Sequence, residues 1–335
     1  MILGLGLFLL IGAIAVYSSG ILPGTGQDST PTPPAQVVAT ESQDANEVPV
    51  DAGDSAADDG NAGDLEIPEA TEDDGSEQQS AAREEIVCID AGHGGWDPGR
   101  VRMGDDRAPY LEESDINLGM AWMLKENLEA KGFQVVLTRE SGAPVNIFNE
   151  DVNGDGAVMQ DIQGGDQAGD RDELQARINV CNEANADILI SLHINGHDDP
   201  AARGYEILFT PAPDRTFGDQ SKDLAYYVFD AMTTKFDDIG FVTNARGAKP
   251  DTDVDAALHE GRVEEHMVLL GPAINATDFS IVPSSMPGII CEAAFITNDA
   301  DAEFLADPDN QREIVDAYAN GIVQYFDQYP GHFQR

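Results

Sequence analysis

Basic side chains are scarce in this sequence of 335 residues. Eighteen Lys and Arg residues stand against 62 Asp and Glu residues, which gives a formal net charge of -44. Because so acidic a chain repels other polyanions, we expect no nucleic acid as a partner and no attraction to an anionic membrane surface. The charge balance instead indicates high solubility or adaptation to salt.

Cysteine is also scarce. The three residues are Cys88, Cys181 and Cys291. Apolar residues flank Cys88 on both sides, and two isoleucines precede Cys291. An odd number at such wide spacing is typical neither of a disulfide framework nor of a CxxC metal site. The sequence therefore predicts three buried thiols that act as small hydrophobic side chains.

The first 82 residues contain no Lys or Arg at all. Fourteen acidic residues lie between Glu41 and Ser80, and aromatic side chains are almost absent from that stretch. Such a composition cannot bury enough apolar surface to offset the entropy of ordering the chain. We therefore expect residues 23–83 to form a disordered acidic linker, which charge repulsion and the prolines of residues 30–34 keep extended.

An apolar segment precedes this linker. Residues 2–16 are an unbroken run of apolar residues and glycine, and with its continuation to Leu22 the run is about long enough for one membrane span. Residues 1–22 are interpreted as either a cleaved signal peptide or a single-span membrane anchor, and both remain open. Either alternative predicts that the rest of the protein is extracytoplasmic.

The remaining 250 or so residues alternate short apolar runs with helical periodicity. Four helices are predicted over residues 116–131, 173–184, 223–234 and 312–326, and five strands over residues 86–89, 133–138, 188–193, 205–209 and 288–292. This alternation predicts one α/β domain over residues 84–330, a three-layer αβα arrangement with a largely parallel mixed sheet.

Three predicted strands end in, or lead directly to, a polar residue that can do chemistry. His93 follows the first strand, His193 ends the third and Glu292 ends the last. In parallel sheets, sites gather at the carboxyl ends of the strands. Two histidines and one carboxylate form a known catalytic zinc set. Residues 112–115 offer Glu112, Glu113 and Asp115 as the carboxylate ligand, and the pattern alone does not choose between them.

These segments resemble the zinc-dependent N-acetylmuramoyl-L-alanine amidase family. The similar stretches are Ile89-Asp-Ala-Gly-His-Gly-Gly-Trp-Asp-Pro-Gly, Leu111-Glu-Glu-Ser-Asp-Ile-Asn-Leu, Ala186-Asp-Ile-Leu-Ile-Ser-Leu-His-Ile-Asn and Met286-Pro-Gly-Ile-Ile-Cys-Glu-Ala-Ala-Phe-Ile-Thr-Asn. They occur in the family's order between about Ile86 and Phe326. A stretch over residues 145–170 departs from the pattern as an apparent insertion.

The resemblance implies an activity and a role for each residue. Zinc would be held by His93, Glu113 and His193, and Glu292 would be the catalytic general base and acid. The implied reaction is hydrolysis of the amide bond between N-acetylmuramic acid and L-alanine in peptidoglycan, carried out in the cell wall. Two alternatives are a non-catalytic wall-binding protein of the same fold and a zinc peptidase that cuts within the stem peptide.

The apparent insertion contains a second candidate metal site. Asp151-Val-Asn-Gly-Asp-Gly has the spacing at which a calcium loop begins, with Asp151, Asn153 and Asp155 as ligands. The twelfth position is Ile162, where a calcium loop has glutamate. Calcium binding and a plain acidic surface loop therefore both remain as interpretations.

Overall fold

The structure is a computed structural model. It describes residues 82–330 except 106, 157, 159–167, 255–261, 264–265 and 277–278. The predicted signal or anchor over residues 1–22 and almost all of the predicted linker over 23–83 lie outside the described residues. Among the described residues, no helix combines the length and apolarity that crossing a membrane requires.

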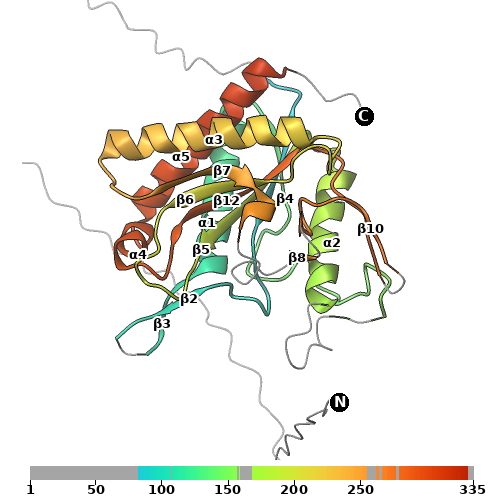
Figure 1. Cartoon of the computed structure of the whole chain (residues 1–335), viewed down its shortest axis with the longest axis horizontal. Helices are drawn as coiled ribbons and strands as arrows, with labels where there is room; N and C mark the ends of the chain where they lie inside the picture. The colour runs from blue at the N-terminus through green and yellow to red at the C-terminus, as the bar shows by residue number, and fades with distance from the viewer. Residues whose placement is uncertain are drawn as a thin grey trace, which may run out of the picture. The chain divides into compact units, whose positions relative to one another are not determined.

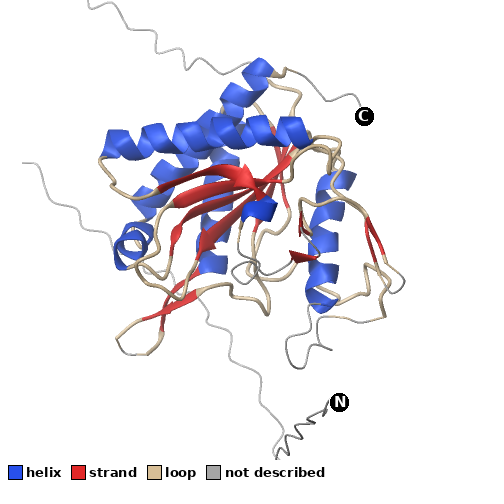
Figure 2. Cartoon of the chain, in the orientation of Figure 1, coloured by secondary structure: helices blue, strands red, loops and turns tan. Residues whose placement is uncertain are grey.

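A six-stranded sheet forms the centre of the domain (Figure 2). Its order is β4 (Gln134–Leu137), β1 (Ile86–Ala91), β5 (Ile188–Asn195), β12 (Gly288–Phe295), β6 (Tyr205–Phe209) and β7 (Ala245–Pro250). The first four strands are parallel, β6 runs antiparallel to β12, and β7 is parallel to β6. The predicted mixed, largely parallel sheet is confirmed.

Helices cover both faces of this sheet (Figure 1). One face packs against α1 (Glu113–Ala130), α3 (Gly218–Ile239) and α5 (Pro308–Gln328), and α2 (Ala168–Glu183) lies on the other. The three-layer prediction is therefore confirmed, and each predicted helix is present with a longer span. A short helix, α4 (Asp299–Leu305), and strand β7 were not predicted.

The smaller elements are short and lie outside the central sheet. Two-stranded pairs are formed by β2 (Val101–Met103) with β3 (Pro109–Glu112), β8 (Arg262–Val263) with β9 (His266–Met267), and β10 (Ile274–Asn275) with β11 (Ser280–Ile281). A 3-10 turn, η2, spans Asp251–Asp253. Strands of two to four residues carry too little periodicity to be recognised in a sequence.

Local capping chemistry sets the ends of several helices. The Asp307 side chain accepts a hydrogen bond from the Asp309 amide at the start of α5, where Pro308 occupies the first turn. The Asn298 side chain caps α4 in the same way. Gly240, with φ of 70°, ends α3 in the left-handed conformation that glycine adopts without strain.

The face of the sheet that packs against α2 is apolar at one end and polar at the other. Cys88 on β1 is the register neighbour of Leu189 on β5, and Ile290 on β12 lies beside Ser191, two residues further along β5. Cys88, Leu189 and Ile290 all belong to the apolar layer beneath α2. Two residues further along each strand the same face carries Asp90, Ser191 and Glu292. Because side chains alternate between faces with a period of two, this switch places the polar residues together at the carboxyl edge.

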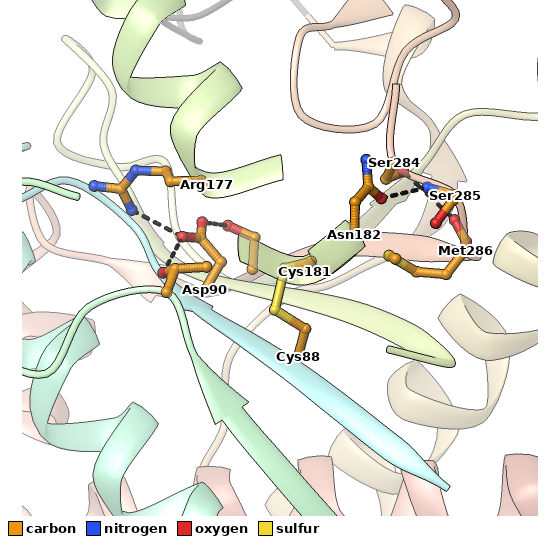
Figure 3. The surroundings of a disulfide bond; sticks show 10 residues. Cys88, Asp90, Arg177, Cys181, Asn182, Ser284, Ser285 and Met286 are labelled. Atoms are coloured by element: carbon orange, nitrogen blue, oxygen red, sulfur yellow. Dashed lines mark hydrogen bonds and ion pairs between the residues drawn. A yellow bond between two sulfur atoms is a disulfide. The ribbon is translucent and has the colours of Figure 1, made fainter. Parts of the chain in front are cut away.

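A disulfide joins β1 to α2, which contradicts the prediction of three free thiols. Cys88 and Cys181 are bonded, with their Cα atoms 5.5 Å apart (Figure 3). The two residues are 93 positions apart in the sequence, so only the packing of α2 on β1 reveals that they meet. The prediction holds for Cys291, which is a buried free thiol.

We predict that the double substitution Cys88→Ala with Cys181→Ala lowers the free energy of unfolding by roughly 2–5 kcal/mol, because the bond closes a long loop of the unfolded chain. Urea unfolding of the full chain measures the change. Cys291→Ala is the matched control. It should lower the free energy of unfolding by only about 1 kcal/mol, because it removes the packing of one buried sulfur atom. Thiol titration of the unfolded parent should find one free thiol per chain, whereas three would exclude the bond.

Candidate metal and catalytic site

His93, Glu113 and His193 meet at the carboxyl edge of the sheet. One potential ligand atom of each lies within 4.8 Å of the other two. Oε1 of Glu113 is 3.0 Å from Nε2 of His93 and 3.2 Å from Nδ1 of His193, and these two ring nitrogens are 3.2 Å apart. The three side chains come from a loop, a helix and a strand, and together they could hold one metal ion.

The start of α1 selects Glu113 among the three candidate carboxylates. Glu113 is only 2% exposed. Oε2 accepts a hydrogen bond of 2.9 Å from the Arg100 amide, and Oε1 accepts one of 3.0 Å from the Ile194 amide. Asp115 is exposed and Glu112 lies in β3, so neither takes part in this cluster.

Two glycines make room for the cluster. A Cβ atom on Gly92 would lie 2.4 Å from the His193 ring, and one on Gly99 would lie 2.7 Å from Oε2 of Glu113. Since real Cβ atoms do not approach so closely, a side chain at either position would displace a candidate ligand. His93 itself has φ of 61°, so the loop turns sharply as it presents the ring.

Two buried arginines hold the backbone of this loop. Arg139 donates to the carbonyl oxygens of Ala91 at 2.8 Å and Gly92 at 3.0 Å. Arg177 donates to the carbonyl oxygens of Ala91 at 2.7 Å and His93 at 2.6 Å. Each guanidinium offers five donors in a rigid plane, so these contacts fix the loop in one conformation.

The charge of Arg177 is balanced by two carboxylates. Its guanidinium lies 2.8 Å from Oδ1 of Asp90 and 2.7 Å from Oε1 of Glu173 (Figure 3 shows the contact with Asp90). Asp90 also accepts from the hydroxyls of Thr138 and Ser191 at 2.6 and 2.7 Å. Burial alone would raise the pKa of Asp90, but Arg177 and these two hydroxyls hold it below its ordinary value.

The cluster perturbs the titration of its own members. Burial alone would lower the pKa of His93, but the Glu113 and Asp97 carboxylates raise it to about 10. Burial would likewise raise the pKa of Glu113, yet the two histidines hold it well below its usual range. Asp97 contributes through an Oδ2 atom 2.5 Å from Nδ1 of His93. The negative charge of Glu113 therefore attracts positive charge to this point.

Glu292 lies beside the cluster on β12. It is the register neighbour of His193 on β5 and of Glu206 on β6, and its side chain is 4% exposed. Burial and the charges of Glu113 and Glu206 raise its pKa well above the usual value. Glu206 itself pairs with Arg246 at 2.8 Å and Lys249 at 2.6 Å, so its own charge is compensated.

A pocket opens onto these residues. Its polar wall includes His93, Glu113, His193 and Glu292, and its apolar wall is formed by Leu174, Met267, Val268, Leu269 and Ile290. Three candidate metal ligands and a carboxylate with a raised pKa thus face one cavity. Such an arrangement can activate a water molecule against a bound substrate.

The structure brings together the four residues that the sequence predicted for the site, whereas the sequence did not predict the residues that support them. The roles of Asp97, Arg139 and Arg177 follow from hydrogen bonds between segments far apart in the sequence. A weak signal existed for Asp97, which lies four residues after His93 within the glycine-rich stretch. In the apparent insertion, Asp151 and Asp155 lie close to Asp172, a residue not predicted to take part.

Comparison with known proteins identifies the family. The family model described as N-acetylmuramoyl-L-alanine amidase matches residues 87–324. The chain therefore belongs to this family, and the match spans nearly the whole of the predicted catalytic domain.

Individual relatives are distant. The chain is 25% identical over 258 residues to N-acetylmuramoyl-L-alanine amidase AmiC of Neisseria meningitidis serogroup B, a match that covers 72% of this chain and 53% of AmiC. It therefore spans about half the length of that relative. It is 26% identical over 243 residues to the uncharacterized protein YqiI of Bacillus subtilis, covering 72% of this chain and 85% of YqiI.

A solved structure shares the fold. The CwlD amidase from Clostridioides difficile, determined in complex with the GerS lipoprotein, superposes with a TM-score of 0.52 at 22% identity. The superposition covers 73% of this chain and 99% of that structure. At this identity the similarity establishes the three-layer fold alone.

We predict that Asp90→Asn lowers the free energy of unfolding at neutral pH by roughly 3 kcal/mol, because it removes one of the two carboxylates that compensate buried Arg177. The folded pKa of Asp90 lies below its ordinary value of 3.8. The unfolded state therefore takes up this proton first as the pH falls, so the contribution of Asp90 is complete above about pH 4 and is lost below it.

Urea unfolding at pH 3 and at pH 6 measures this effect. The difference in the free energy of unfolding between the parent and Asp90→Asn should be large at pH 6 and smaller at pH 3. The control is Glu129→Gln, which removes the exposed pair with Lys125 and should change the free energy by less than about 0.5 kcal/mol. An equal difference at both pH values would contradict the assignment of this pH dependence to Asp90.

Proposed function

We propose that this protein is a zinc-dependent N-acetylmuramoyl-L-alanine amidase, which hydrolyses the amide bond between N-acetylmuramic acid and L-alanine in peptidoglycan. One observation carries the proposal: His93, Glu113 and His193 converge within 4.8 Å at a pocket that Glu292 also lines. Membership of the amidase family supports the choice of bond. The names of the relatives supply the substrate class.

The donor set fits zinc. Two imidazole nitrogens and one carboxylate oxygen are a ligand set of catalytic zinc sites, which keep one further position for water. The hydrogen bond between Nδ1 of His93 and Asp97 leaves Nε2 as the ligand atom, which is how outer carboxylates orient metal-binding histidines. When bound, zinc would lower the pKa of its water to about 7 and polarise the substrate carbonyl.

Glu292 moves the proton in this proposal. Its carboxylate takes the proton of the attacking water and delivers it to the nitrogen of L-alanine as that nitrogen leaves. Burial and the charges of Glu113 and Glu206 raise the pKa of Glu292, which makes its carboxylate a stronger base toward the proton of water. The apolar wall of the pocket, including Leu174 and Met267, limits the access of bulk water.

The location follows from the substrate. We infer an extracytoplasmic catalytic domain over residues 84–330, exported by the apolar segment 1–22 as a signal peptide or tethered by it as an anchor. A coil of about sixty linker residues has an end-to-end distance of roughly 40–50 Å, which charge repulsion extends. An anchored enzyme could then reach wall strands near the membrane.

The reaction is tested by digesting purified peptidoglycan with the full chain and identifying the released ends by mass spectrometry. The proposal expects free L-alanine amino termini on stem peptides and intact muramic acid. New ends inside the stem peptide would instead identify a peptidase. Binding without any release would identify a non-catalytic wall-binding protein.

We predict that Glu292→Gln keeps the fold and the bound zinc but lowers turnover by about 10²–10⁴-fold, because general acid–base groups typically contribute that much. The same digestion assay measures the loss. The control Glu303→Gln changes an exposed carboxylate of α4 and should keep full activity. Near-normal turnover by Glu292→Gln would rule out the proposed proton transfer.

Metal content gives a separate prediction. The full chain should contain close to one zinc ion, and His93→Ala or His193→Ala should lose it, since either removes one of three protein ligands. Elemental analysis by mass spectrometry measures zinc independently of activity. His197→Ala, a histidine four residues from His193 and outside the cluster, should keep the metal. Zinc retained in both ligand variants would disprove this site.

A further inference from the structure

A second group of carboxylates lies away from the amidase pocket. One ligand atom each of Asp151, Asp155 and Asp172 lies within 4.8 Å of the other two. The first two come from the apparent insertion, and Asp172 comes from α2. Three negative charges at such distances repel one another strongly unless a cation compensates them.

The loop that carries the first two residues is folded as a tight turn. Oδ1 of Asp151 accepts a hydrogen bond of 2.7 Å from the Gly154 amide, and its Oδ2 accepts one of 3.0 Å from the Gly156 amide. Oδ1 of Asn153 accepts one of 2.9 Å from the Asp155 amide. The Asp151 carboxylate thus closes the turn and also lies near the carboxylates of Asp155 and Asp172, at the spacing with which a calcium loop begins.

Asp172 supplies the independent observation that a ligand belongs here. The residue is 0% exposed. Its Oδ1 accepts from the amides of Val152 at 2.7 Å and Asn153 at 2.9 Å, whereas its Oδ2 finds no hydrogen-bond donor among the described residues. A buried carboxylate oxygen without a donor is costly, and a bound cation removes that cost.

The electrostatics agree with this geometry. Burial raises the pKa of Asp172, and the charges of Asp155 and Asp151 raise it further, against the two amide hydrogen bonds that lower it. A divalent cation beside these carboxylates would oppose this effect, because an opposite charge favours the ionised form.

We propose that Asp151, Asp155 and Asp172, together with the Asn153 side chain, bind one calcium ion. Asp172 supplies from α2 the closing carboxylate that the twelfth position of the loop, Ile162, cannot provide. The available ligand atoms are carboxylate and amide oxygens in an irregular arrangement, which suits the six to eight ligands of calcium better than the strict octahedron of magnesium.

The ion would fasten the insertion to α2. Residue Glu173, next to Asp172, accepts from the amides of Val145 and Asn146 at 2.8 Å each and pairs with Arg177. Arg177 in turn donates to the His93 carbonyl. The calcium site thus stabilises the start of the helix that holds the loop of the amidase site, and the ion itself does not take part in the reaction.

Thermal unfolding of the zinc-loaded full chain tests the proposal. Calcium chloride at about 100 times its dissociation constant should raise the melting temperature by roughly 5–10 °C, because the ion binds only the folded state. Asp172→Asn should abolish the rise while keeping an oxygen for the amides of Val152 and Asn153. The control Glu150→Gln removes an exposed acid next to Asp151 and should show the parent's full rise.

Hydrogen exchange locates the ion. Calcium should slow hydrogen exchange of the Val152, Asn153 and Gly154 amides in the parent. It should not change the exchange rates of these amides in Asp172→Asn. The proposal is overturned if the parent's melting temperature does not respond to calcium, or if Asp172→Asn responds as strongly as the parent. It is also overturned if magnesium at the same concentration gives an equal rise, which would indicate general screening of this acidic chain.

Discussion

The buried ion pair between Arg177 and Asp90 is the interaction on which the site depends. It joins α2 to the end of β1, and the same guanidinium donates to the backbone on both sides of the turn that presents His93. Arg139 donates to the Ala91 and Gly92 carbonyl oxygens of the same turn. Because a buried guanidinium without a carboxylate would be costly, the position of α2 and the conformation of this loop are set together.

The disulfide extends this connection along the same helix. Cys181 lies one turn beyond Arg177 on α2 and joins Cys88, two residues before Asp90 on β1. The apolar layer, the covalent bond and the ion pair thus follow one another along one helix–strand contact (Figure 3). These contacts give a rigid support for the candidate metal ligands, which catalysis would require to be positioned within a fraction of an ångström.

Three neighbouring carboxylates at the sheet edge differ in how their charge is compensated. Glu206 pairs with Arg246 and Lys249, and Glu113 contacts two histidines, so both have a lowered pKa. Glu292, between them, has a raised pKa because burial and those two charges act on it together. In the proposed mechanism the same type of side chain therefore serves as a metal ligand, Glu113 at the start of α1, and as a proton carrier, Glu292 on β12.

Sequence alone determined the elements and the central residues. The alternation of apolar runs gave the layers, and His93, His193 and Glu292 could be found because a strand end is visible in a local pattern. Tertiary structure alone decided which distant residues meet: Cys88 with Cys181, Arg177 with the His93 carbonyl, and Asp172 with the turn at Asp151. Local periodicity reports the face on which a side chain lies, whereas these contacts depend on where α2 crosses the sheet, which is fixed by the packing of the whole core.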